Sequence, residues 1–348
     1  MIQTIFFISS GLFLGWSLGA NDAANLFGTA VGTRMVRFYT AALIISFFVI
    51  IGAVLSGSGA SHTLGALGNV TTMPGAFVVA LAAALTVFWM TKLGLPVSTS
   101  QAIVGSIVGW NFFVGIQTDS YVLTKIVTTW ITGPILSALF AMFFYQIIKL
   151  VLYKFKLHLF KIDFYNRLGL ILVGAFGAYS LGANNIANVM GVFTDVSPFE
   201  TVNFFGFINL NSVQQLFLLG GISIAVGVFT YSKRVMMTVG RSITDISPIA
   251  ALIVVLSSST VLFLFASQGL KTWLTMRGLP SFPLVPVSSS QAVVGAILGI
   301  GIIKGGRNIN LTVLGNIGLG WVVTPLVSAL ISYISLFFMQ NVFMQVIH

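Results

Sequence analysis

The sequence predicts an all-α polytopic membrane protein with about ten transmembrane segments in two inverted-topology repeats of five, whose broken helices meet at the membrane midplane. Composition is the first reason, because 57% of the 348 residues are hydrophobic and only 6% are charged, whereas soluble proteins carry about 25% charged residues. Apolar runs of transmembrane length recur along the whole chain, which indicates many helices. Runs such as 41–54 and 249–256 do not alternate polar and apolar residues, which excludes an outer-membrane β-barrel.

The first half of the chain holds five apolar segments. The first ends at Gly19, before a basic loop with Arg34 and Arg37. A Gly/Ser-rich link containing His62 follows the second segment, Lys92 ends the third, and a turn near 117–120 precedes the fifth. The five predicted segments are residues 1–18, 41–54, 76–90, 96–114 and 122–149.

The second half repeats this pattern after a short basic link. We expect residues 1–150 to form the first repeat with its amino terminus outside, 151–167 a cytoplasmic linker and 168–348 the second repeat. Asp245 is expected either to cap the helix that follows it or to reach the cavity, and the sequence favours capping. The predicted segments of the second half are 168–192, 213–231, 249–266, 284–303 and 311–338.

Three motifs occur twice in the same order. Gly19-Ala-Asn-Asp-Ala-Ala-Asn25 recurs 163 residues later as Gly182-Ala-Asn-Asn-Ile-Ala-Asn188. Pro96-Val-Ser-Thr-Ser-Gln-Ala102 recurs 190 residues later as Pro286-Val-Ser-Ser-Ser-Gln-Ala292. A Trp-x-x-x-Pro-x-x-Ser-Ala-Leu motif starts at Trp130 and recurs 191 residues later. The halves are therefore homologous, and an odd number of segments in each places the second upside down in the membrane.

Basic residues test this topology. With the amino terminus outside, thirteen of the sixteen Lys and Arg residues fall in inside loops, which satisfies the positive-inside rule. The three outside are Lys125, Lys271 and Arg277. The inside set is Arg34, Arg37, Lys92, Lys149, Lys154, Lys156, Lys161, Arg167, Lys233, Arg234, Arg241, Lys304 and Arg307. We therefore attribute the formal charge of +10 to the orientation of the chain in the cell membrane, and we expect no nucleic-acid partner.

Asp22 is the sharpest candidate for a functional residue. An ionised group inside a span costs at least ~2.5 kcal/mol and usually marks a functional site. The nearest basic residue along the chain is Arg34. Carboxylate and amide oxygens suit Na⁺, and a carboxylate alternatively takes H⁺. We predict a cation site from Asp22 and its neighbour Asn21, together with Asn184 and Asn185 of the second copy, although a helix cap or polar packing between helices would explain these residues too.

The Pro-Val-Ser motifs and two further asparagines predict a site for a small anion. Proline followed by Ser or Thr is typical of a first helical turn, where free backbone N–H groups favour anions. Hydroxyls and amides add neutral donors. Ordinary capping is the alternative. We expect Gly19 and Gly182 to mark unwound helix breaks. The predicted anion-binding residues are Asn25, Ser98, Thr99, Ser100, Gln101, Asn188, Ser288, Ser289, Ser290 and Gln291.

The four motifs contain no Lys or Arg, so a bound anion would be offset by cations and helix dipoles. This is a physical reason for coupled transport, in which rocking of the two repeats exposes the site to each side in turn. The sequence has no cysteine and no Gly-Lys-Ser/Thr motif, which disfavours thiolate metal sites and an ATP-driven pump.

Gly19–Asn25, the following Gly28-Thr-Ala-Val-Gly32 and the doubled Pro-Val-Ser motifs resemble the inorganic phosphate transporter (PiT) family. The stretch from Ser232 to Ile246 also resembles its second half. The resemblance implies symport of inorganic phosphate with Na⁺, sometimes H⁺, at a site between the repeats. Two features depart from the family: Asn185 stands where Asp is common, and the hydrophilic loop between halves is reduced to 149–167.

Other functions remain open at this stage. A permease for sulfate or a related oxyanion would use the same fold, and an anion-selective channel would use the same hydroxyls. An intramembrane enzyme is disfavoured, because no paired carboxylate, Ser–His pair or metal cluster is evident. The expected partners are phosphate, Na⁺ and the lipid bilayer, no cofactor is expected beyond the coupling ion, and a homodimer is compatible with the sequence.

Overall fold

The computed structural model describes residues 2–92, 97–155, 158–204, 208–242, 247–305 and 311–347. These residues form a nearly all-helical molecule with one small β-hairpin, whose strands Val202–Phe204 (β1) and Ile208–Leu210 (β2) pair antiparallel, Val202 opposite Leu210. The hairpin was not anticipated from the sequence. Within the described residues, eight helices are long and apolar enough to cross a membrane.

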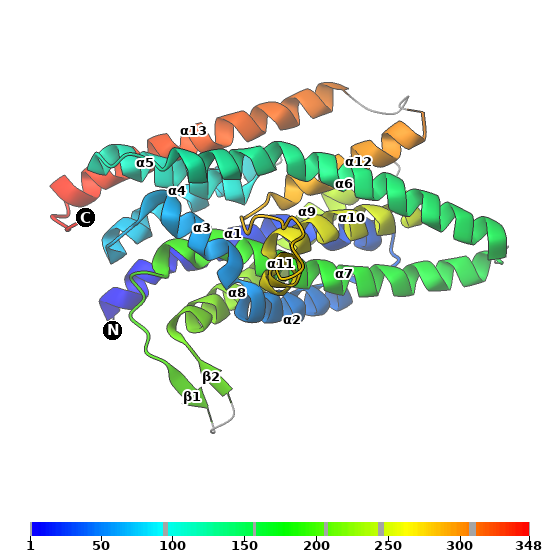
Figure 1. Cartoon of the computed structure of the whole chain (residues 1–348), viewed down its shortest axis with the longest axis horizontal. Helices are drawn as coiled ribbons and strands as arrows, with labels where there is room; N and C mark the ends of the chain where they lie inside the picture. The colour runs from blue at the N-terminus through cyan, green and yellow to red at the C-terminus, as the bar shows by residue number, and fades with distance from the viewer. Residues whose placement is uncertain are drawn as a thin grey trace.

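The first half comprises six helices. α1 is followed by α2, the short α3 and then α4; the shorter α5 precedes the long α6 (Figure 1). Their bounds are Ile2–Gly32 (α1), Phe38–Ser56 (α2), Ser58–Gly68 (α3), Met73–Lys92 (α4), Thr99–Val114 (α5) and Ser120–Phe155 (α6).

The second half follows the same plan and adds the hairpin and one short helix, α11. Its elements are Leu159–Met190 (α7), the 3₁₀ turn Gly191–Phe193, the hairpin, Ser212–Thr230 (α8), Ser232–Ser242 (α9), Pro248–Ala266 (α10), Gln268–Thr275 (α11), Ser289–Ile303 (α12) and Leu311–Asn341 (α13). The ten predicted segments correspond to α1, α2, α4, α5, α6, α7, α8, α10, α12 and α13. α5 and α12 have only 16 and 15 residues, so their contribution to a full ten-span count stays a prediction.

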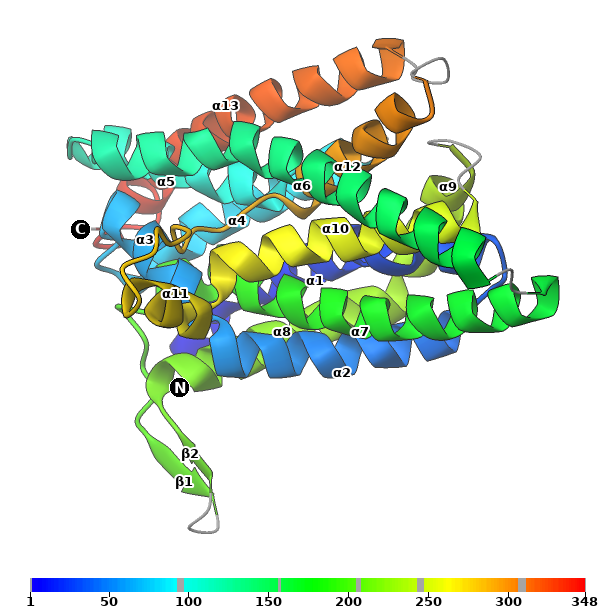
Figure 2. The same cartoon turned by 45° about the vertical axis from the view of Figure 1, so that its right-hand side comes forward.

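The two halves interlock through reciprocal helix pairs. α1 packs on α8 and α2 on α7, while α5 packs on α13 and α6 on α12. In both views α1 and α7 run in opposite directions along the long axis (Figures 1 and 2). Both chain termini and the hairpin lie toward one end of the molecule, and the end of α6 with the beginning of α7 lies at the other (Figures 1 and 2). Figure 2 shows α11 toward the same end as the termini. This arrangement is compatible with the predicted inversion of the second repeat.

The glycines that open the first motif serve close packing, and the expectation of unwound breaks at Gly19 and Gly182 is wrong. α1 and α7 continue as helix through both motifs. A Cβ added at Gly19 would lie 2.0 Å from the Ile224 carbonyl oxygen, and one at Gly182 would lie 2.2 Å from that of Val49. Only glycine lets these backbones approach so closely, so the residue type reports a helix–helix contact.

The predicted linker 151–167 is mostly helical, and its assignment as the cytoplasmic link between the repeats stays a prediction. α6 continues to Phe155 and α7 begins at Leu159. No Gly or Pro occurs between Pro134 and Gly169, so the strong helix breakers are absent from this stretch of sequence. His62 likewise lies on helix α3 and not in a loop. Asp245 lies outside the described residues; Ser247 caps α10 through the Ala250 N–H.

Candidate ion-binding site

The four polar motifs meet inside the helix bundle. Two come from the second half of α1 and the carboxyl-terminal end of α7, and two from the amino-terminal ends of α5 and α12. Most of these side chains are buried, whereas Asn21 and Asn25 are half-buried. The buried members are Asp22, Ser98, Thr99, Ser100, Gln101, Asn184, Asn185, Asn188, Ser288, Ser289, Ser290 and Gln291. Hydrogen bonds between the motifs join them into one polar cluster between the two halves.

The first turns of α5 and α12 are capped in the same way. Ser98 accepts a hydrogen bond from the Gln101 N–H, and Ser288 accepts one from the Gln291 N–H, each at 3.3 Å. This confirms that both motifs start helices. Each cap satisfies one of the N–H groups that the first turn leaves without a helical partner. The positive end of each helix dipole lies at this amino terminus and is directed at the cluster.

Asp22 joins the first repeat to the second. Its Oδ2 accepts a hydrogen bond from Ser289 Oγ at 2.8 Å, and its Oδ1 accepts one from Asn21 Nδ2 at 3.1 Å. Asn25 Nδ2 donates to the same Ser289 hydroxyl at 3.4 Å. Among the described residues no Lys, Arg or His forms a salt bridge with Asp22, and the ion pair found is Arg167 with Asp163 on the surface. Neutral donors thus hold this buried carboxylate.

Hydroxyl groups tie the beginnings of α5 and α12 to each other. Ser100 Oγ donates to the Val287 carbonyl at 3.3 Å, and Ser290 Oγ donates to the Val97 carbonyl at 3.0 Å. The two bonds correspond, because Ser100 and Ser290 are equivalent positions 190 residues apart, as are Val97 and Val287. Asn188 Nδ2 donates to Ser100 Oγ at 2.8 Å and so attaches α7 to this pair.

The asparagines of the second repeat have different partners from those of the first. Asn184 Oδ1 accepts from the Val287 N–H at 2.7 Å, and its Nδ2 donates to the Val285 carbonyl at 3.1 Å. Asn185 Oδ1 accepts from Asn188 Nδ2 at 3.4 Å. Of the four residues predicted to bind a cation, Asn21 and Asp22 contact each other, whereas Asn184 is bonded to main chain and Asn185 to a neighbour on its own helix.

Several buried polar atoms of the cluster have no hydrogen-bond partner among the described residues. They are Thr99 Oγ1, Gln101 Oε1, Asn188 Oδ1 and Gln291 Oε1. Leaving a buried polar group unpaired costs about 1–3 kcal/mol, and such groups in a folded protein call for an explanation such as a ligand. Oxygen atoms together with a buried carboxylate suit a hard cation such as Na⁺, while the hydroxyl and the helix dipoles suit an anion.

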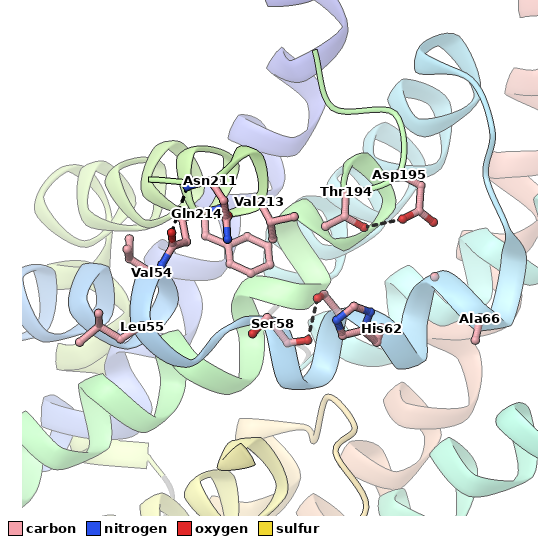
Figure 3. Close-up of a pocket in the computed structure, with 13 residues that line it drawn as sticks. Val54, Leu55, Ser58, His62, Ala66, Thr194, Asp195, Asn211, Val213 and Gln214 are labelled. Carbon is pink, nitrogen blue, oxygen red and sulfur yellow. Dashed lines mark hydrogen bonds between the residues drawn. The ribbon is translucent and has the colours of Figure 1, made fainter. Parts of the chain in front are cut away.

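One small cavity borders the cluster, and a larger pocket lies elsewhere in the helix bundle. A cavity of about 30 Å³ borders Asn25 and is lined by residues such as Thr29, Leu170 and Val255. A larger pocket of about 300 Å³ lies between α2, α3 and α8 near the end that holds the amino terminus, and His62 and Asp195 line it (Figure 3). The sequence did not indicate this pocket, because its residues come from separate segments and α3 was expected to be a loop.

Comparison with known proteins adds three findings. A model of the phosphate transporter family matches residues 18–332 of the chain. A relative from Pyrococcus abyssi, provisionally named a phosphate permease, is 28% identical over 93% of this chain and 95% of its own length. The sulfate permease CysP of Bacillus subtilis is 31% identical over 93% of this chain and 84% of its own length.

A solved structure, described as the sodium-dependent phosphate transporter, shares the fold. Its TM-score with this chain is 0.75 at 25% sequence identity, over 97% of this chain and 100% of the other. The likeness extends over both halves, so it includes the elements that position all four polar motifs.

Proposed function

Because the chain belongs to the phosphate transporter family, we propose that it carries inorganic phosphate across the cell membrane together with Na⁺, at the polar cluster between its two halves. It is a multi-pass membrane transporter and not an enzyme. The observation that carries the proposal is the environment of Asp22. This buried carboxylate bonds to neutral donors from both halves, with no salt bridge among the described residues, so a bound cation would supply the missing charge.

Phosphate would bind at the beginnings of α5 and α12. Both helices direct their first-turn N–H groups at the cluster, and helix amino termini favour anions. The side chains that would add donors are Asn25, Ser98, Thr99, Ser100, Gln101, Asn188, Ser288, Ser289, Ser290 and Gln291. Since this set contains no basic residue, it neutralises no charge of the anion by itself.

The coupling cation would bind at Asp22 and Asn21, with Asn184 and Asn185 on the opposite side of the cluster. A buried anion and a buried cation each carry a large desolvation cost, and each offsets part of the cost of the other. Binding of phosphate without Na⁺ would therefore be weak, which couples the two fluxes. Na⁺ is favoured over H⁺ by the name of the structural neighbour and by the amide oxygens beside Asp22.

Movement of the site between the two faces would follow from the doubled architecture. The reciprocal packing of α1 on α8 and of α2 on α7 supports two inverted repeats that rock against each other around a fixed site. This is the alternating-access mechanism of secondary transporters built from such repeats.

Uptake of labelled phosphate into proteoliposomes tests the proposal. Accumulation above equilibrium is expected when Na⁺ is higher outside than inside, and it should collapse when the Na⁺ gradient is removed. A pH gradient at equal Na⁺ serves as the comparison for H⁺ coupling. Phosphate uptake that responds to neither gradient would refute coupled transport.

Sulfate is the second candidate substrate, because a sulfate permease is among the relatives. The cluster offers neutral donors that suit either oxyanion. Uptake of labelled phosphate and of labelled sulfate, each competed by the other anion unlabelled, separates the two substrates. Sulfate uptake without phosphate uptake would assign the protein to sulfate, whereas phosphate uptake that is indifferent to a hundred-fold excess of sulfate would assign it to phosphate.

A further inference from the structure

We propose that Asn184 and Asn21 are alternating latches. Each holds the main chain ahead of the short helix of its own repeat, α12 for Asn184 and α5 for Asn21, in one of the two transport states. The latch of the second repeat is closed in this structure and that of the first is open. The inference rests on the proposed alternating-access function, and it assigns two residues to a positioning role beyond ion binding.

The closed latch is a two-point attachment to main chain. Asn184 is fully buried, and its carboxamide accepts from the Val287 N–H at 2.7 Å and donates to the Val285 carbonyl at 3.1 Å. A longer bond of 3.5 Å reaches the Leu262 carbonyl on α10. The amide thus pairs with the backbone as a neighbouring β-strand would. It fixes the residues ahead of α12, whose first turn presents Ser288–Gln291 to the cluster.

The equivalent latch in the first repeat is open. Asn21 corresponds to Asn184, and Val97 corresponds to Val287. Asn21 is half-buried and donates to Asp22 Oδ1. Across the described ranges, no hydrogen bond joins Asn21 to Val97. The difference is local, because the Ser100–Val287 and Ser290–Val97 bonds are both present.

A contact present in one repeat and absent from its equivalent is what an exchange between two states requires. If two homologous halves swap conformations, each takes over the contacts that the other has given up. Closing Asn21 on Val97 while Asn184 releases Val287 would change the positions of both helix starts. The hydrogen bonds of Ser100 and Ser290 to the main chain of the opposite repeat would persist through the exchange, since they occur in both repeats.

Single-cysteine reporters test the proposal directly, because the chain contains no cysteine. Ser61→Cys places a thiol in the pocket between α2, α3 and α8, and Thr29→Cys places one beside the cavity at Asn25. The rate of maleimide labelling in lipid nanodiscs, without phosphate or Na⁺, reports the exposure of each side. Loss of one latch should shift the populations on the order of five-fold, as expected for a buried hydrogen bond.

The two latch variants are expected to change the rate of maleimide labelling in opposite directions. Relative to the reporter parent, Asn184→Ala should change the Ser61→Cys rate in one direction and Asn21→Ala should change it in the other, with the Thr29→Cys rate responding in the opposite sense. A purely structural role would loosen the protein in both variants and move the rates the same way. Changes of equal sign, or no change, would overturn the latch proposal.

Val97→Pro provides a test that does not perturb the closed latch. It removes the N–H that Asn21 would take in the other state, a contact that this structure does not contain, so it remains informative if Asn184→Ala fails to fold. It should shift labelling in the direction of Asn21→Ala, while Val97→Ala, which keeps the N–H, should match the parent. Equal behaviour of the two Val97 variants would refute the exchange. Opposite shifts in a protein that takes up no phosphate would uphold the latches and refute the proposed substrate instead.

Discussion

At the scale of single residues, the two repeats place different chemistry at the same position. Asp22 and Asn185 are equivalent in the doubled motif, and both are buried. The carboxylate reaches across to Ser289 of the other repeat, whereas the amide oxygen is satisfied by Asn188 on its own helix. The cluster is therefore asymmetric in charge, which should concentrate cation binding on the Asp22 side.

Asp22→Asn tests this assignment. The substitution keeps the size of the side chain and removes its charge, so Na⁺-driven phosphate uptake should fall by at least about ten-fold, the loss expected for a single strong charge interaction of ~1.4 kcal/mol or more. Asp163→Asn is a matched control, because that carboxylate is exposed and pairs with Arg167; it should leave uptake unchanged. Normal uptake with normal Na⁺ dependence in Asp22→Asn would place the cation site elsewhere.

Asn185→Asp tests the asymmetry from the other side. A second buried carboxylate needs its own compensating charge, so the variant should bind an additional cation for each phosphate. The measurement is the steepness of uptake against Na⁺ concentration, which should increase relative to the parent. Asn185→Gln, which adds no charge, should not make the dependence steeper, and an unchanged steepness in Asn185→Asp would contradict the expected second site.

At the scale of elements, the discontinuous helices α5 and α12 are held by long helices from the opposite repeat. Gly105 on α5 faces the Pro325 carbonyl of α13, and Gly295 on α12 faces the Pro134 carbonyl of α6; an added Cβ would lie 2.2 Å from the oxygen in each case. Both prolines lie inside their helices, where each lacks the N–H that would otherwise bond the carbonyl four residues earlier. The glycines allow the backbones to meet at these points.

Gly295→Ala should destabilise the protein although alanine is the better helix former. The new methyl group would overlap the Pro134 carbonyl, and overpacking of this kind costs about 1–3 kcal/mol. Gly315→Ala on α13 is the control, because nothing lies within 4 Å of a Cβ there and helix propensity favours the change. Thermal denaturation in detergent should show a lower midpoint for Gly295→Ala than for Gly315→Ala, and the reverse order would contradict the close contact.

At the scale of the whole molecule, the exposed basic residues bear on the predicted topology. The basic end of the bundle, which holds the α6–α7 junction, carries exposed Lys154 and Lys161 (Figures 1 and 2). α11, which carries exposed Lys271, lies toward the end with both termini in Figure 2. The basic end would therefore face the anionic inner surface of the membrane.

Labelling of single cysteines in intact cells tests this orientation. Lys271→Cys and Lys161→Cys both lie at exposed positions, so their reactivity with a membrane-impermeant maleimide depends on the side of the membrane. Lys271→Cys should react in intact cells, and Lys161→Cys should react only after the cells are opened. The opposite pattern would invert the topology and with it the assignment of the two faces of the site.

Much of the site could be predicted from the sequence because its polar motifs occur in both halves of the chain. The doubled motifs identified all four helix regions that meet in the cluster, and Ser98 and Ser288 cap their helices as expected. The prediction that failed concerns a residue type with two structural uses. Gly19 and Gly182 were expected to be helix breaks, yet they allow close contacts with α8 and α2, which the order of residues along one chain does not reveal.

The membrane class, the doubled architecture and the identity of the polar residues could all be predicted from one chain, since these depend on composition, periodicity and repetition. The partner that each polar group takes depends on the tertiary structure. Asn184 and Asn21 are equivalent in sequence, but one holds Val287 and the other holds Asp22. Equivalent residues occupy unequal environments because the two repeats adopt different conformations, and that difference arises from contacts between segments far apart in the chain.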